Sequence, residues 1–113
     1  MTERRREPRF DVQLAVRVWG NDSLGKYFEE NAATLNISFF GALLLGITHP
    51  LKPGDDLNVQ YQKTRARFKV MWARDFSDGR KLRVALLRYD AEPCPWEHEL
   101  LHFSERPAAE SFT

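Results

Sequence analysis

The residue types best suited to binding an anion lie at the start of the chain, in the stretch MTERRREPRF. Arg5 and Arg9 are four residues apart, and Arg4 and Arg6 add two further guanidinium groups. A guanidinium group is planar and permanently charged, and its fixed N–H donors pair two at a time with phosphate oxygens or with the O6/N7 edge of guanine. A charged terminal run is also often a solvated arm, so the arginines alone leave both interpretations open.

A second group of polar residues occurs in the stretch NISFFG at residues 36–41. The amide of Asn36 has an acceptor and two donors, enough to read a base edge, and the hydroxyl of Ser38 could donate to a phosphate or rigidify the bend. Gly41 would permit a positive φ or a close backbone approach that a Cβ would block. Asn-x-Ser beside a glycine is also common turn chemistry, so this motif alone has a structural explanation too.

The elements that must position these residues are strands. Apolar residues at every second position predict a strand from Phe10 to Trp19, the clearest in the sequence. Further strands are predicted at 27–37, 42–47, 57–62, 65–72 and 81–89. The Asp-Gly pair in SDGR, at 77–80, is the strongest short-range hairpin signal in the chain. Six strands joined by short turns, with no helical period between them, predict a compact antiparallel barrel or sandwich.

The pattern changes after Pro93 and Pro95, where four apolar residues occur at helical spacing and predict a short helix at about 95–103. These are Trp96, Leu100, Leu101 and Phe103. At 113 residues the chain is long enough for one domain with a modest core. The predicted organisation is an arm at 1–9, a barrel with its helix at 10–103, and a flexible tail at 104–113 to which no function is assigned.

Together the motifs RREPR and NISFFG resemble the bipartite signature of the PilZ family, RxxxR followed by [D/N]xSxxG. The resemblance covers nearly the whole chain, because the arginine arm, the first strand, the second motif, the later strands and the terminal helix follow the family's order. It implies an all-β fold, a six-stranded antiparallel PilZ-type β-barrel with a short C-terminal α-helix. It also implies binding of the bacterial second messenger cyclic di-GMP, with the signal passed on by a change in the protein's own surface.

The resemblance implies a set of ligand-binding residues. These are Arg4, Arg5, Arg9, Asn36, Ser38 and Gly41. Family members with Asp at the Asn36 position offer only an acceptor, so the detail of base recognition can differ here. In this family an arginine just before RxxxR accompanies two stacked ligand molecules, and Arg4 therefore favours two. Arg6 is not assigned a role.

The function that follows is a binding module rather than an enzyme, with no cofactor besides its ligand. Glu7-Pro8 and the mutually repelling arginines give the arm no packing of its own, so we expect it to be mobile until ligand orders it. Because the arm lies almost at the start of the sequence, we expect the signal to reach a separate protein partner. The alternative is a PilZ-like adaptor for protein interactions in which nucleotide binding is weak or lost.

A competing motif, HELLH at 98–102, matches the HExxH pattern of zinc metalloproteases. On a helix His98 and His102 would share a face and could bind one metal ion, with Glu99 as general base. A catalytic zinc site needs a third protein ligand, and the segment after His102 contains no histidine or glycine in the spacing of the extended motif. We therefore expect partly exposed helix histidines, with no metal site and no protease activity.

Composition limits the other classes of partner. Lys and Arg total 17 against 16 Asp and Glu, a formal net charge of +1, so no global field attracts nucleic acid or an anionic membrane. Arg65, Arg67 and Lys69 could form a basic stripe on one strand, but a solvated face that discourages edge pairing is the preferred explanation. We expect no binding to nucleic acid.

Two further features bear on location. Cys94 is the single cysteine, which excludes an internal disulfide and favours a reducing compartment. The longest apolar stretch, 39–47, is interrupted by Gly41 and Gly46 and is too short to cross a bilayer. The charged N-terminus has no hydrophobic region behind it, so no signal peptide is predicted. These features predict a cytoplasmic protein without membrane insertion.

Overall fold

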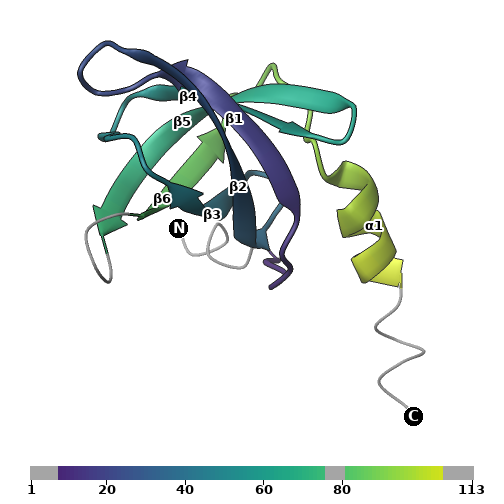
Figure 1. The fold of residues 1–113 in the computed structure, drawn as a ribbon. Coiled ribbons are helices and arrows are strands. Elements are labelled where there is room, and N and C mark those ends of the chain that lie inside the picture. Colours follow the sequence, from purple (N-terminus) through teal and green to yellow (C-terminus); the bar gives the residue numbers. More distant parts are fainter. Residues whose placement is uncertain (1–7, 76–80, 106–113) are drawn as a thin grey trace, which may run out of the picture.

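The computed structural model describes residues 8–75 and 81–105. The elements in these residues are β1 (Ala15–Asn21), β2 (Tyr27–Ile37), β3 (Gly41–Ile47), β4 (Asp56–Tyr61), β5 (Thr64–Asp75), β6 (Leu82–Arg88) and α1 (Glu97–Glu105). Neighbouring strands pair antiparallel in the order β1-β2-β3-β6-β5-β4, and β4 pairs back to β1 to close a barrel (Figure 1). The helix follows the last strand and lies beside the barrel. This confirms the predicted six-stranded antiparallel barrel with a short C-terminal helix.

The alternation of apolar residues places one face of each strand inside the barrel. In β5, for example, Ala66, Phe68 and Val70 are buried while the residues between them are exposed. Side chains of successive strand residues point to opposite faces, so this pattern fills the interior from every strand. The fully buried members with the largest side chains include Phe68, Ile37, Leu44, Ile47, Leu57, Val18, Val59, Val70 and Val84.

The first strand begins later than the sequence pattern predicts, and the cause is a buried threonine on β2. The segment before β1 follows β2, but only Phe10 forms a backbone bridge, to Ile37. Further along, the Leu14 N–H donates to Thr34 Oγ1 (2.8 Å), and that hydroxyl donates to the carbonyl of Val12 (2.6 Å). A side chain thus replaces part of the backbone ladder, so residues 10–14 are not a regular strand although Val12 and Leu14 still pack on the core.

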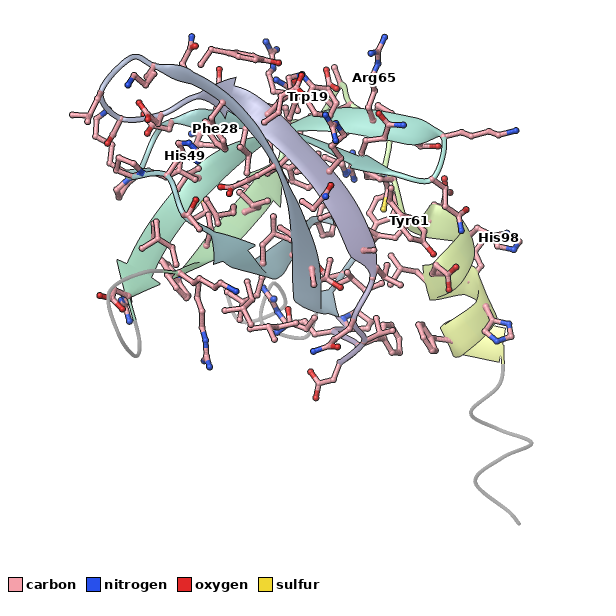
Figure 2. All side chains as sticks on the ribbon, in the orientation of Figure 1. Trp19, Phe28, His49, Tyr61, Arg65 and His98 are labelled. Atoms are coloured by element: carbon pink, nitrogen blue, oxygen red, sulfur yellow. The ribbon has the colours of Figure 1, made fainter. Side chains whose placement is uncertain are left out.

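The helix is fixed to the barrel by residues at both of its ends. It begins at Glu97, two residues later than predicted, after a turn in which the Glu97 N–H donates to the carbonyl of Cys94. Burial raises the pKa of the Cys94 thiol. Tyr61 of β4 donates its hydroxyl hydrogen to Glu99 Oε2 (2.9 Å), and the ring of Phe103 stacks on Phe10 with centroids 5.3 Å apart. In Figure 2, Tyr61 lies between the barrel and α1.

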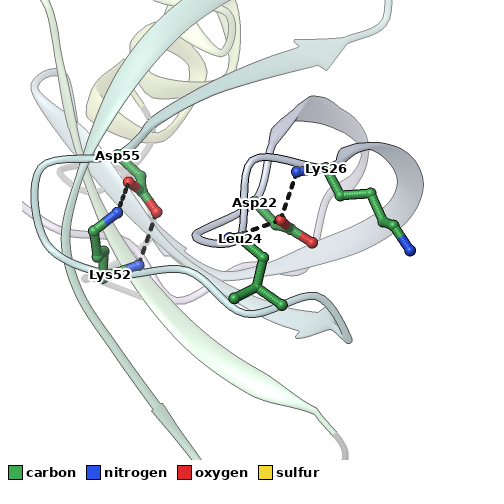
Figure 3. Close-up of polar contacts among 5 residues, drawn as sticks. All are labelled: Asp22, Leu24, Lys26, Lys52 and Asp55. Carbon is green, nitrogen blue, oxygen red and sulfur yellow. Dashed lines mark hydrogen bonds and ion pairs between the residues drawn. The ribbon is translucent and has the colours of Figure 1, made fainter.

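Two loops are closed by carboxylates (Figure 3). Asp22 Oδ1 accepts from the N–H groups of Leu24 and Lys26, both at 2.9 Å, and the bond from Lys26 is the main reason why the pKa of Asp22 is lowered. Asp55 accepts from the backbone N–H and from Nζ of Lys52 (3.0 and 2.9 Å). These local bonds stabilise two turns that contain Gly and Asp, residues typical of turns.

The predicted hairpin turn at 77–80 lies outside the described residues. The strands that flank it, β5 and β6, pair antiparallel up to Asp75 opposite Leu82. Among residues 8–75 and 81–105, no helix has the length and apolar character needed to cross a membrane.

Candidate functional site

The two sequence motifs meet at the point where the chain enters the barrel. Phe10 and Ile37 exchange two backbone hydrogen bonds, of 2.9 and 3.0 Å, which fix the preceding residue beside the end of β2. There Arg9 Nη1 donates to Asn36 Oδ1 at 3.0 Å, across 27 residues of sequence. Arg9 is exposed and Asn36 is half-buried, so the guanidinium and the amide are both accessible to a ligand. Arg4 and Arg5, the other predicted arginines of the site, lie outside the described residues.

The remaining two residues of the predicted site form the turn between β2 and β3. Ser38 is fully buried; its Oγ accepts from the Gly41 N–H (3.0 Å), and its own N–H donates to the Gly41 carbonyl (2.9 Å). Of the two roles open to this hydroxyl, the geometry favours rigidifying the bend. Gly41 is required because a Cβ there would clash with the carbonyl oxygen of Leu86 on β6, whereas a positive φ is not the reason.

A row of cross-strand neighbours extends from Asn36 over the outer surface of the barrel. A bulge in β2 after Thr34 turns Asn36 outward, opposite Leu43 of β3. Leu43 in turn lies opposite Ala85 of β6, and Ala85 lies opposite Trp72 of β5. The residues on either side of Leu43 and Ala85 are buried in the core, so this row is on the outside. With strands about 4.8 Å apart, the row spans about 14 Å.

Trp72 is a residue of this surface that the sequence pattern assigns to the wrong face. The pattern groups it with Phe68 and Val70, which point inward. A bulge between Val70 and Trp72 shifts the register, so that Trp72 points outward and Ala73 packs on the core instead. The guanidinium of Arg74 lies over the Trp72 ring, 4.7 Å from its centroid. An indole with a stacked guanidinium provides a flat surface on which a nucleobase could stack.

An apolar groove of about 200 Å³ lies between α1 on one side and the segment before β1 and the β2–β3 turn on the other. Its lining residues are Pro8, Phe10, Phe39, Glu97, Leu100 and Leu101. Phe39 and Leu101 are 45% and 54% exposed, and Phe40, beside Phe39, is 48% exposed. The groove therefore borders both motifs, because Phe10 follows Arg9 and Phe39 lies within NISFFG.

The residues of the competing motifs occupy other surfaces. His98 and His102 of α1 are exposed, and Glu99 accepts a hydrogen bond from Tyr61. Within the part of the chain that the structure describes, no three His, Cys, Asp or Glu side chains are grouped so as to hold a metal ion. Arg65 and Arg67 are exposed on the outer face of β5, with the Arg67 guanidinium 5.1 Å from the centroid of the Tyr89 ring.

Comparison with protein families agrees with this arrangement. The model of the PilZ domain matches residues 3–106 of the 113-residue chain. The chain belongs to the PilZ family. No curated protein matches the sequence.

Membership of the PilZ family confirms the resemblance inferred from RREPR and NISFFG. PilZ domains form a family of cyclic di-GMP receptors that are typically not enzymes. The matched region begins before the arginines and includes both motifs, the barrel and α1. The contact between Arg9 and Asn36 therefore joins the two halves of the PilZ signature.

Proposed function

We propose that this PilZ domain is a cyclic di-GMP receptor and adaptor, which binds the nucleotide between its N-terminal arginines and the outer surface that begins at Asn36. The observation that supports this most directly is the 3.0 Å hydrogen bond from Arg9 to Asn36. Through this bond a permanent cation lies beside an amide that could read a base edge, and both groups are accessible. The buried turn residues Ser38 and Gly41 would support that surface from below.

Cyclic di-GMP has two phosphodiester anions and two guanine bases. Arg5 and Arg9 would pair with phosphate oxygens or with the O6/N7 edge of guanine, and the Asn36 amide would bind a base edge. Ser38 and Gly41 would act through the shape of the turn. Trp72, with Arg74 on its face, offers a stacking surface further along the outer row.

We propose a stoichiometry of two stacked nucleotides, on the basis of Arg4. Two stacked molecules bring four phosphate charges together, and an additional guanidinium both offsets this charge and stacks on a guanine face. The ligand is the only small molecule in this proposal; no cofactor, metal ion or catalytic step is needed.

The proposed output is an interaction with a separate protein, triggered when ligand orders the arginine arm. The groove between Phe10, Phe39 and α1 supports this. A ligand held by Arg9 and Asn36 would lie close in sequence to two residues that line the groove, Phe10 and Phe39. We propose that the protein acts in the cytoplasm, outside any membrane and without binding nucleic acid.

Calorimetric titration of the protein with cyclic di-GMP is the test. We expect saturable binding with two nucleotides per chain, and a value of one after Arg4→Leu. Hydrogen exchange should slow at the amides between residues 3 and 9 when the nucleotide is added. No heat at ligand concentrations far above the micromolar range would refute the receptor function, and unchanged exchange would refute the ordering of the arm.

The second candidate is a PilZ adaptor with weak or no nucleotide binding. It is favoured by the exposure of two large apolar side chains that line one groove, Phe39 and Leu101, and of Phe40 beside Phe39. Exposed apolar groups gathered in one place are typical of protein contacts. The same titration separates the two candidates, because only the receptor binds cyclic di-GMP.

A further inference from the structure

The turn that carries the second motif has all four of its successive backbone carbonyls hydrogen-bonded. Gly41 and Ser38 bond each other within the turn, as described above. The other three carbonyls are bound by residues from far along the chain. The indole N–H of Trp96 donates to the Ser38 carbonyl (2.8 Å), Arg88 Nε donates to that of Phe39 (3.1 Å), and the Arg88 N–H donates to that of Phe40 (2.7 Å).

The side chains of these two donor residues, Trp96 and Arg88, are themselves held in place. Trp96 is 1% exposed, and its ring stacks on Phe68 with centroids 5.5 Å apart. The Arg88 guanidinium lies over the Phe39 ring, 4.6 Å from its centroid, and Nη1 also donates to the Glu92 carbonyl (2.5 Å). Side chains fixed by packing on one side and hydrogen bonds on the other hold their partners in one geometry.

We infer that Arg88 and Trp96 are positioning residues of the nucleotide site, acting through the turn at 38–41 rather than by touching the ligand. This inference rests on the proposed cyclic di-GMP function. The turn joins the end of β2, where Asn36 meets Arg9, to the start of β3. If its carbonyls lose their donors, the turn gains other conformations and the end of β2 is less well fixed beside the arginine.

The inference assigns a function to contacts that span 49 and 58 residues of sequence. The buried Ser38 carbonyl has no access to water that would replace the indole N–H, so its loss leaves an unsatisfied acceptor. Arg88 cannot be replaced by lysine without loss, because a single ammonium group cannot bond two carbonyls in the planar geometry of the guanidinium.

The first measurement uses the protein without ligand. Arg88→Lys keeps the charge but removes the planar donors, and Trp96→Phe keeps an aromatic ring but removes the indole N–H. We expect hydrogen exchange at the amides of Ser38 and Gly41 to become about tenfold faster in both variants. The exchange rate at the amide of Val18 in β1 should change only as much as the global stability of each variant changes.

The second measurement is calorimetry with cyclic di-GMP. We expect Kd to rise about tenfold in Arg88→Lys and in Trp96→Phe, since one hydrogen bond to a fixed group is worth about a factor of ten. The matched control is Val59→Ala. Val59 is fully buried in β4, opposite β3 in the barrel order, so its loss lowers Tm without touching the turn. Its Kd should stay within twofold of the wild-type value.

The outcomes are distinct. If wild-type protein binds cyclic di-GMP and both variants bind it equally well, the positioning role is wrong and the proposed function stands. If binding weakens while exchange at Ser38 and Gly41 is unchanged, Arg88 and Trp96 do not act through the turn, and the inference is also wrong. If Val59→Ala weakens binding as much as the variants do, the effect is general destabilisation. If wild-type protein does not bind, the proposed function fails and this inference fails with it.

Discussion

Within the described part of the chain, the side chains of Arg9 and Asn36 join the end of the arginine arm to the barrel surface. Neither residue is buried deeply, and the bond between them is one exposed contact, so it contributes little to the stability of the fold. Its importance lies in orientation. It holds a guanidinium beside an amide, the two groups to which the proposed function assigns the phosphate and the guanine edge.

Replacing either motif arginine should weaken the binding of cyclic di-GMP without affecting the fold. Loss of a charge-assisted hydrogen bond costs about 1.5 to 3 kcal/mol, so Arg5→Ala or Arg9→Ala should raise Kd roughly ten- to a hundredfold. Calorimetry measures this directly. Arg65→Ala, which removes an exposed arginine of β5 away from the motifs, is the control. Equal Kd values for Arg9→Ala and wild type would remove Arg9 from the site.

Substitution of Gly41 is expected to change the stability of the fold, because it acts on the backbone. Gly41→Ala would push the turn away from the Leu86 carbonyl of β6, and we expect it to lower the free energy of unfolding by about 2 kcal/mol or more. Gly25→Ala is the comparison: it has a positive φ of 82° but open space around it, so only about 1 kcal/mol of strain is expected. Urea denaturation checks that Gly41→Ala loses more stability than Gly25→Ala. If the close approach of Gly41 to Leu86 did not matter, Gly25→Ala would lose more.

At the scale of elements, β2 organises the region around the site. Its Thr34 hydroxyl connects the segment before β1 to the barrel, its bulge turns Asn36 outward, and its far end holds a second polar cluster. There Glu30 accepts from the Thr48 N–H and hydroxyl, both at 2.9 Å, and contacts His49 Nδ1 at 3.1 Å. The ring of His49 stacks on Phe28, with centroids 4.4 Å apart (Figure 2).

Removing the Thr34 hydroxyl should destabilise the entry to the barrel. Thr34→Val keeps the shape but leaves the Leu14 N–H and the Val12 carbonyl without their partner, and each unsatisfied group costs about 1 to 3 kcal/mol. We expect the free energy of unfolding to fall by about 2 kcal/mol or more in urea. Thr64→Val, at a half-buried position at the start of β5, should change it by less than about 1 kcal/mol. Similar losses in both variants would contradict the role of the hydroxyl.

The cluster at Glu30 predicts a pH dependence of stability. Burial raises the pKa of Glu30, but the hydrogen bonds from His49 and Thr48 together outweigh it, and the pKa is lowered. A carboxylate with a lowered pKa stabilises the fold above its unfolded pKa, and this contribution is lost as pH falls through the folded value. From about pH 6 to about pH 3, wild type should therefore lose more stability than Glu30→Gln.

Urea denaturation at several pH values tests this difference. Glu97→Gln, which removes an exposed carboxylate of α1, should follow the wild-type curve. If the Glu30→Gln curve is also parallel to that of wild type, then Glu30 contributes nothing to acid sensitivity.

At the scale of the whole molecule, the closed barrel leaves no free strand edge among its six strands and supports the site as a rigid surface. Residues from the segment before β1, from the β2–β3 turn and from α1 gather at one side of it. A ligand bound between the arginine arm and the outer row that begins at Asn36 would contact strands β2, β3, β6 and β5 at once. Its binding should therefore stabilise the molecule as a unit.

Adding cyclic di-GMP should raise the Tm of the whole domain. At a free ligand concentration of 100 times Kd, mass action adds about 2.7 kcal/mol for each occupied site, and for a domain of this size one site corresponds to a shift of about 10 °C. Differential scanning calorimetry measures the shift. Arg9→Ala should show a smaller shift at the same concentration, and cyclic di-AMP, whose bases lack the guanine O6 acceptor, should show less than cyclic di-GMP. If cyclic di-GMP shifts the Tm of Arg9→Ala as much as that of the wild type, recognition by Arg9 is excluded.

The amino-acid sequence by itself determined the strands, the helix and the two motifs. Alternation of apolar residues reflects the preference of each residue for the core or for water. It is a local signal that a few neighbouring positions are enough to show. The spacing of RREPR and NISFFG was likewise visible without coordinates. From these features, six antiparallel strands, a C-terminal helix and the PilZ signature could all be predicted.

Only the tertiary structure decided the features that depend on register. The hydroxyl of Thr34, rather than a backbone carbonyl, accepts the hydrogen bond from the Leu14 N–H. A bulge after Val70 turns Trp72 outward, against the sequence pattern. Arg88 and Trp96 reach the turn from 49 and 58 residues away. The physical reason is that bulges and long-range hydrogen bonds depend on how distant segments pair, and this pairing is set by packing of the complete barrel rather than by local preference.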